Sequence, residues 1–215
     1  MKRIFAAIII ITIAWGCNND NKQPVIPTEK IILVAIDSTL ITDSSWGPVT
    51  RNADIASLIP TYSNANVKDE RICGPECADS IDVTRIYPDT KNEFIVYWKD
   101  SLYHKAISFI EARADGSPYH TAGGLKTGST LSDLLKENGK PISFSGFGWD
   151  YGGYVQSFQY GKLDNSTIGF RLDVAETSDN SLLGDRELST EMPAVKKALD
   201  KITVWTISLS FTKAQ

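Results

Sequence analysis

The sequence predicts an α+β fold in which antiparallel sheets are combined with short helices. Alternating apolar and polar residues, typical of half-buried strands, recur between turns that contain glycine or proline. Helical spacing of apolar residues occurs only in short segments. A hydrophobic content of 42%, with 10% aromatic residues, is sufficient for a buried core. The length of 215 residues fits one or two compact units.

The amino-terminal residues predict an export signal over residues 1–16. Met1–Arg3 is short and basic, and the apolar run Ile4–Trp15 is shorter than the roughly 20 residues that span a bilayer. Gly16 and Cys17, followed at once by polar residues, resemble a lipoprotein box. The resemblance implies cleavage after Gly16 and acylation of Cys17 with palmitate. The alternative is an ordinary signal peptide or a tail anchor.

Residues 17–29 are expected to form a lipidated, flexible tether. The predicted location is therefore the cell envelope, anchored to the outer membrane through the lipid on Cys17, with the body facing the periplasm or the surface. A formal net charge of -4 without a lysine or arginine cluster argues against nucleic acid as a partner. The expected partners are the membrane, through the anchor, and an envelope protein or glycan. No cofactor is predicted, and apart from Cys73 and Cys77 no His or Cys has the spacing of a zinc site.

The first half of the body, residues 30–115, is predicted to contain one helix and several extended segments. Asn52 caps the helix and Pro60 ends it. The apolar face of this helix is expected to consist of Ile55, Leu58 and Ile59. Three segments are expected to be strands, and a fourth fits either a strand or a short helix: Lys30–Leu40, Ile81–Tyr87, Glu93–Trp98 and then Tyr103–Arg113.

The second half, residues 116–215, begins after the turn at Asp115–Gly116. Thr130 and Asp133 form a capping box for a helix that stops at Asn138–Gly139. The remaining predicted elements are strands at Ile142–Trp149, Tyr154–Tyr160, Thr167–Val174 and Ile202–Phe211, and a helix at Pro193–Leu199. In the last strand, alternation places Trp205, Ile207, Leu209 and Phe211 on one face.

A shift of 76 residues superposes the apolar stripes of the two predicted helices. The stripe of Ile55, Leu58 and Ile59 then coincides with that of Leu131, Leu134 and Leu135. This predicts two helix-then-meander repeats, which could form two halves or one compact unit. The alternative is that two unrelated α+β segments share the same order of elements.

Cys73 and Cys77 flank Gly74–Pro75, a tight turn that can bring the two sulfur atoms together. Export permits disulfides, so a structural disulfide is expected. A redox-active pair, free thiols or a metal site are the alternatives.

The segment Gly146–Tyr154 contains the candidate binding residues Trp149, Asp150, Tyr151 and Tyr154. Read as a strand, it places Phe147, Trp149 and Tyr151 on one face, where aromatic rings can stack against a sugar or a protein. The alternative is that the aromatic residues belong to the core and the glycines form bends.

Asp150 is also a candidate for the centre of an envelope hydrolase. A general acid usually needs a second carboxylate at a defined separation, and Asp173 and Asp185 are possible partners. The alternative is a turn-forming or hydrogen-bonded aspartate. No catalytic residue is predicted.

The stretch Gly128–Leu135 with Asn138–Pro141, followed by Gly146–Gly153, resembles a set of uncharacterised, Bacteroidota-type envelope lipoproteins. The order of helix and strands is more loosely similar to the outer-membrane assembly lipoprotein BamE and to the β-lactamase inhibitor protein. That resemblance implies binding to a protein through the concave face of the sheet or through loops.

Together these observations predict a non-catalytic binding module for protein–protein interaction or inhibition. One alternative is a glycan-binding module, which requires coplanar, solvent-facing rings at Trp149, Tyr151 and Tyr154. Another is a hydrolase, which requires a carboxylate or histidine within about 10 Å of Asp150 in a cleft.

Overall fold

The computed structural model describes residues 37–74, 77–175 and 179–211. The predicted leader, Cys17 and the tether lie outside the described residues, as does most of the predicted strand Lys30–Leu40. Asp37–Gln215 group as one compact unit. None of the described helices is long and apolar enough to cross a bilayer.

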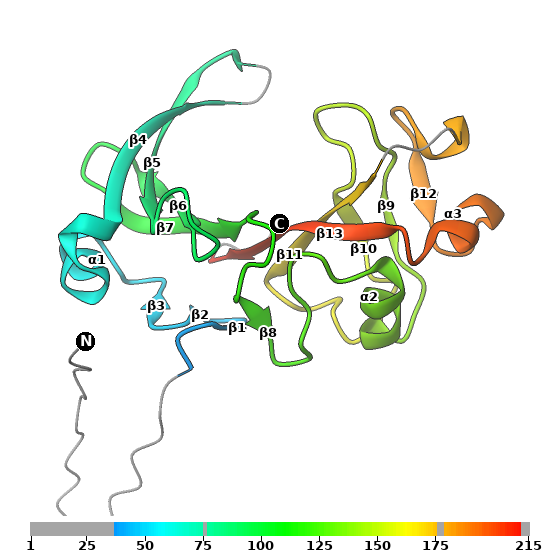
Figure 1. Ribbon diagram of the computed structural model, residues 1–215, viewed down its shortest axis with the longest axis horizontal. Helices are drawn as coiled ribbons and strands as arrows, with labels where there is room; N and C mark the ends of the chain where they lie inside the picture. Colours follow the sequence, from blue (N-terminus) through cyan, green and yellow to red (C-terminus); the bar gives the residue numbers. More distant parts are fainter. Residues whose placement is uncertain (1–36, 75–76, 176–178, 212–215) are drawn as a thin grey trace, which may run out of the picture. The chain divides into compact units, whose positions relative to one another are not determined.

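The described residues are mostly β-structure with a few short helices, arranged as shown in Figure 1. All strand pairs are antiparallel except β1–β8, which agrees with the predicted combination of antiparallel sheets and short helices. The strands are β1 (Leu40–Thr42), β2 (Ser45–Trp46), β3 (Val49–Thr50), β4 (Val67–Cys73), β5 (Ser80–Ile86), β6 (Phe94–Asp100), β7 (Lys105–Ala112), β8 (His120–Thr121), β9 (Ser143–Ser145), β10 (Val155–Ser157), β11 (Ile168–Val174), β12 (Glu187–Ser189) and β13 (Ile202–Ser210). The α-helices are α1 (Ile55–Tyr62), α2 (Leu131–Asn138) and α3 (Pro193–Ala198), and 3₁₀ turns occur at η1 (Asn64–Asn66) and η3 (Asn180–Leu182).

One six-stranded sheet contains strands from both sides of the Asp115–Gly116 turn. Its strand order is β11-β13-β7-β6-β5-β4, so β13 pairs directly with β7. The first half thus supplies a four-stranded meander, β4 to β7, and the second half extends it by two strands. Two smaller sheets, β3-β2-β1-β8 and β10-β9-β12, complete the described strands.

The two halves share an order of elements but differ in their strand pairing. An eight-residue helix precedes antiparallel strands in each half. After α1 the strands form a single meander, whereas after α2 they are divided between two sheets.

The second predicted helix is confirmed, whereas the first differs in its cap. At α2, Thr130 and Asp133 form the predicted capping box, and Gly139 has the left-handed conformation that ends a helix. At α1, Asp54 rather than Asn52 is the cap, because its side chain and that of Ser57 form a reciprocal capping box.

Two further predictions for α1 are wrong. Pro60 lies inside the helix and does not end it, and the helix continues to Tyr62. Ile59, placed on the apolar face, is 36% exposed, and the buried residues of α1 are Leu58 and Tyr62. The buried stripe therefore follows an i, i+4 spacing.

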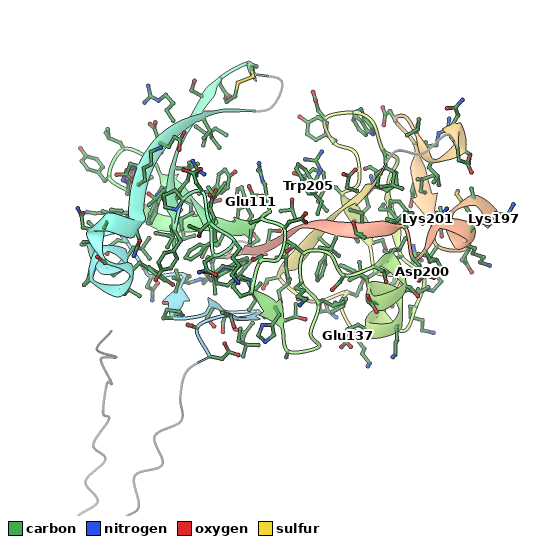
Figure 2. The ribbon with its side chains drawn as sticks, viewed as in Figure 1. Glu111, Glu137, Lys197, Asp200, Lys201 and Trp205 are labelled. Carbon is green, nitrogen blue, oxygen red and sulfur yellow. A yellow bond between two sulfur atoms is a disulfide. The ribbon has the colours of Figure 1, made fainter. Side chains whose placement is uncertain are left out.

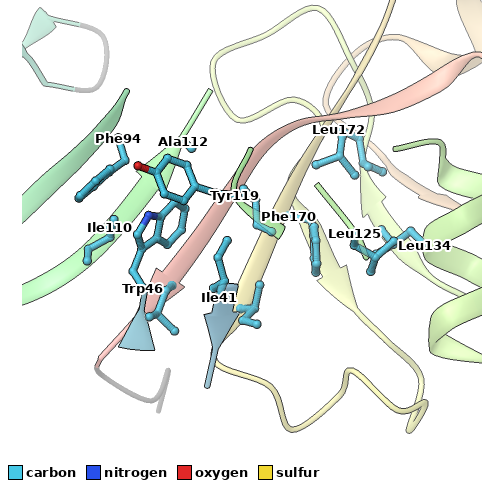
Figure 3. Packing of buried hydrophobic residues seen from close by; sticks show 14 of the residues in the cluster. Ile41, Trp46, Phe94, Ile110, Ala112, Tyr119, Leu125, Leu134, Phe170 and Leu172 are labelled. Atoms are coloured by element: carbon cyan, nitrogen blue, oxygen red, sulfur yellow. The ribbon is translucent and has the colours of Figure 1, made fainter. Parts of the chain in front are cut away.

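A single hydrophobic core lies against one face of the six-stranded sheet. Figure 3 shows Trp46, Phe94 and Tyr119 packed together, with Phe170 and then Leu134 farther along the same cluster. The ring of Tyr119 lies 5.1 Å from Trp46 and 5.3 Å from Phe94. Because residues of both halves share this core, the described body folds around one interior.

A β-bulge in β13 changes the face on which Trp205 lies. Arg171 of β11 pairs with Thr206, but the next residue, Leu172, pairs with Val204, so Trp205 is an extra residue in the ladder. Ile207, Leu209 and Phe211 point into the core as predicted. The prediction that Trp205 shares their face is wrong, because the bulge interrupts the two-residue alternation and leaves Trp205 40% exposed.

Candidate functional site

Six side chains gather on the outer face of the six-stranded sheet, which is the face opposite the core. Glu111 and Arg113 alternate along the chain with the buried Ile110 and Ala112, and therefore project from this outer face. Figure 2 labels Glu111 and Trp205, which belong to the neighbouring strands β7 and β13. We refer to the following residues as the outer-face cluster: Tyr97, Glu111, Arg113, Tyr154, Arg171 and Trp205.

Arg171 of β11 holds the segment Gly146–Tyr154 against the sheet. Its Nε donates to the carbonyl oxygen of Gly152 and its Nη2 to that of Asp150, both at 2.8 Å. Its guanidinium carbon lies 4.7 Å from the ring centre of Tyr154 and 4.8 Å from that of Trp205. Arg171 is therefore fixed by hydrogen bonds along its edge and by cation–π contacts with two rings.

Glu111 and Tyr97 fix the other end of the cluster. The hydroxyl of Tyr97 donates to Glu111 Oε1 at 2.6 Å, and Glu111 also forms an ion pair with Arg113. Burial, together with the Glu111 carboxylate, raises the pKa of Tyr97, so this phenol keeps its proton and remains a donor. The Arg113 guanidinium lies 5.8 Å from the ring of Trp205, which connects both ends of the cluster.

Two hollows border the cluster on this face. One, of about 390 Å³, lies between the Gly146–Tyr154 segment and the sheet, and Trp149, Asp150, Arg171, Asp173 and Trp205 line it. The other, of about 400 Å³, adjoins Glu111 and Arg113 from the side of Ile95 and Asp115. The hollows therefore bring aromatic, cationic and anionic side chains to the borders of the cluster.

The four predicted binding residues lie together, although not as a flat platform. Trp149 is half-buried and donates its indole N–H to the carbonyl oxygen of Gly146 at 2.8 Å, whereas Tyr151 and Tyr154 are 47% and 45% exposed. The rings of Trp149 and Tyr151 meet at 63°. This pair therefore does not meet the condition of coplanar rings that the glycan-binding alternative sets.

The expectation that Phe147, Trp149 and Tyr151 share one strand face is also wrong. Strand β9 ends at Ser145, and Trp149 and Tyr151 lie in the turn that follows. Phe147 is buried with 4% exposure, whereas Tyr151 faces solvent. The glycines of this segment allow the chain to leave the ladder, so strand alternation does not extend to these residues.

Asp150 has one of its two suggested carboxylate partners nearby. Asp173 lines the same hollow, whereas Asp185 does not. The main-chain carbonyl oxygen of Asp150 accepts a hydrogen bond from Arg171. Within the described ranges, no group of three His, Cys, Asp or Glu side chains could hold a metal ion.

The predicted disulfide is present and separate from the cluster. Cys73 and Cys77 are bonded, with their Cα atoms 4.9 Å apart, at the end of the β4–β5 hairpin. Strand β4 is an edge of the six-stranded sheet, and β11, which carries Arg171, is the opposite edge. The disulfide therefore belongs to the hairpin rather than to the candidate site.

Of the six members of the cluster, the sequence predicts only Tyr154 as a binding residue, and it does not identify the other five: Tyr97, Glu111, Arg113, Arg171 and Trp205. Arg171 had a usable signal, because it alternates with Phe170 and Leu172 in a predicted strand and must point away from the core. Trp205 had no such signal, because only the pairing of β13 with β11 reveals the bulge.

No family model and no curated protein sequence matches this chain. A search of solved structures finds the crystal structure of the uncharacterised protein YfeY from Escherichia coli, with a TM-score of 0.48 and 12% sequence identity. The match covers 80% of this chain and 99% of that chain. At this level the similarity supports no conclusion about fold or function.

Proposed function

We propose that this chain is a non-catalytic lipoprotein of the cell envelope whose body binds another protein through the outer-face cluster. The supporting observation is the row of arginine and aromatic side chains Tyr154–Arg171–Trp205–Arg113. Tryptophan, tyrosine and arginine are the residue types that contribute most binding energy at protein interfaces. Their contacts span the adjacent strands β11, β13 and β7, which is a suitable base for an interface.

The cluster is also held in place before any partner arrives. Arg171 is bound to two carbonyl oxygens and stacked between two rings, and Tyr97 is hydrogen-bonded to Glu111. Side chains that are already ordered lose little conformational entropy on binding. This favours recognition of a folded or extended protein surface by a rigid patch.

The two alternatives derive less support from this geometry. Glycan binding by a flat aromatic platform requires parallel rings, and those of Trp149 and Tyr151 are inclined at 63°. A hydrolase centred on Asp150 would need a polarised carboxylate pair, and both Asp150 and Asp173 are solvent-exposed. The burial in an apolar pocket that adapts a carboxyl group to general acid catalysis is absent at both positions.

The experiment is an affinity measurement with a partner captured from the envelope by the full-length chain. Trp205→Ala is expected to weaken binding of that partner roughly 30-fold, the equivalent of about 2 kcal/mol for a central interface residue. Tyr160→Ala is the matched control, because Tyr160 is an aromatic residue with 92% exposure outside the cluster.

Unchanged affinity for Trp205→Ala would contradict the proposed surface. The anchor is tested in the same cells with a palmitate analogue, which is expected to label the native chain and not the Cys17→Ser variant. Label on both chains would contradict lipidation at Cys17.

A further inference from the structure

The hollow between Trp149 and Trp205 offers two kinds of wall to a ligand. The indoles of Trp149 and Trp205 supply aromatic surface, and the carboxylates of Asp150 and Asp173 supply negative charge. Its volume of about 390 Å³ is large enough to hold one side chain of a ligand. The hollow therefore combines aromatic surface with negative charge.

The aromatic walls are fixed in position. The indole N–H of Trp149 is bonded to Gly146, so this ring is held against its own turn. Trp205 projects from the β-bulge and lies against the guanidinium of Arg171. A cation placed beside an indole face is attracted by the negative potential of the ring.

The carboxylates are available to a ligand. The side chains of Asp150 and Asp173 are exposed, and within the described residues neither forms a hydrogen bond or an ion pair. Each carboxylate can accept hydrogen bonds from an ammonium or guanidinium group, and such charge-assisted bonds are stronger than neutral ones.

Among the described residues that line this hollow, Arg171 is the one with a positive charge, and its guanidinium is already held by its neighbours. Tyr154 and Trp205 lie against its guanidinium, and two of its N–H groups are bonded to the carbonyls of Gly152 and Asp150. The two aspartates and one arginine leave the hollow with a formal charge of one negative unit. The whole chain, with a net charge of -4, has the same sign.

We propose that this hollow receives a lysine or arginine side chain of the protein partner. This inference rests on the proposed function and adds the chemistry of the contact. The ammonium or guanidinium group lies between the carboxylates of Asp150 and Asp173, and the aliphatic stem lies against the indoles of Trp149 and Trp205. The negative charge of the chain steers a basic segment toward the hollow.

The test uses small probes and the full-length chain in detergent. Acetyl-arginine amide and acetyl-lysine amide are titrated while the indole N–H resonances of Trp149 and Trp205 are followed by NMR. Acetyl-citrulline amide is the control probe, because it has nearly the shape of arginine without the charge. We expect saturable shifts of both indole resonances with the basic probes and none with citrulline.

The variant Asp150→Asn/Asp173→Asn keeps the shape of both side chains and removes both charges. It is expected to weaken binding of the basic probes about tenfold. The matched control is Asp164→Asn/Asp200→Asn, which removes the same number of exposed charges elsewhere and should leave binding unchanged. Equal weakening by both double variants would attribute the effect to overall charge and overturn the proposal.

Other results would also overturn it. Equal shifts with citrulline, no saturable shift with either basic probe, or shifts with the neutral sugar chitotriose alone would each exclude a basic side chain as the occupant. If Asp150→Asn/Asp173→Asn leaves the affinity for the captured partner intact while Trp205→Ala weakens it, this inference fails and the proposed function stands.

Discussion

At the scale of single residues, Gly153 determines how closely the binding segment approaches the sheet. Its φ is +79°, and a Cβ atom there would lie 1.9 Å from the carbonyl oxygen of Leu172. Its own backbone donates to Ser145 at 2.9 Å and accepts from Leu172 at 2.8 Å. A side chain at this position therefore meets both an unfavourable backbone conformation and another strand.

Gly153→Ala is expected to destabilise the fold more than Gly124→Ala. At Gly124 φ is +84° and no atom lies within 4 Å of an added Cβ, so this substitution costs only the left-handed conformation, about 1–2 kcal/mol. Gly153→Ala adds a clash with the backbone, which is expected to lower the free energy of unfolding by about 1–3 kcal/mol more. Urea unfolding of both variants measures the difference, and equal losses would contradict the close approach.

The sequence indicates part of this residue-scale picture. Paired glycines at Gly152–Gly153 predict a turn, because only glycine adopts such conformations freely. The strand that Gly153 touches is formed by residues far along the chain, so the close contact could not be predicted from local pattern.

At the scale of elements, Asp43 connects the β1–β2 turn to the start of β11. Its Oδ1 accepts hydrogen bonds from Ser166 Oγ at 2.6 Å and from Thr167 N at 2.9 Å. The hydrogen bond from Ser166, supported by those from Thr167, lowers the pKa of Asp43 from its ordinary value of 3.8. The ionised form is therefore favoured in the folded state.

A lowered folded-state pKa gives stability that is present above pH 3.8 and lost as the pH falls below it. Asp43→Asn should therefore be less stable than the native chain at pH 7, and the difference should shrink toward pH 3. Urea unfolding of both chains at several pH values measures this. Asp164→Asn, an exposed change outside this connection, is the control variant in the same series. A constant difference between Asp43→Asn and the native chain over this pH range would refute the assignment.

Local patterns predict the type of each element better than its exact face. The capping box correctly predicts α2, and apolar alternation correctly predicts the long strands β11 and β13, because each signal is contained within a few neighbouring residues. The short helix α3 also lies where the sequence predicts it. The bulge in β13 is different, since it depends on pairing with β11 and reverses the predicted orientation of Trp205.

At the scale of the whole molecule, the described body is held together across its two halves. Strand β13 pairs with β7 from Ile207↔Ala112 to Ser210↔Phe109. Just after the end of β13, the carbonyl oxygen of Phe211 accepts a hydrogen bond from the Arg51 side chain at 2.7 Å. Removal of the second half would expose one edge of β7 and a large part of the core.

The full-length chain is therefore expected to unfold in one cooperative transition, whereas residues 30–115 alone should not fold. Circular dichroism and tryptophan fluorescence should give coincident urea transitions for the full chain. The isolated half should lack a cooperative transition, because β7 has lost its partner β13. Two separate transitions in the full chain, or a folded isolated half, would show that the halves are independent domains.

Features that depend on near neighbours can be predicted from the amino-acid sequence. These are the class of the fold, the capped helix α2, the turn after Trp149 and the Cys73–Cys77 disulfide. Each arises from side chains and backbone groups within a few residues of one another, so the local pattern contains the necessary chemistry.

The way in which distant residues combine depends on the packing of the folded chain. The placement of Arg171 between Tyr154 and Trp205, and of Asp150 beside Asp173, requires the order β11-β13-β7 and the bulge in β13. The physical reason is that strand register and neighbour choice are set by the packing of the whole core, and that information is not contained in any single segment.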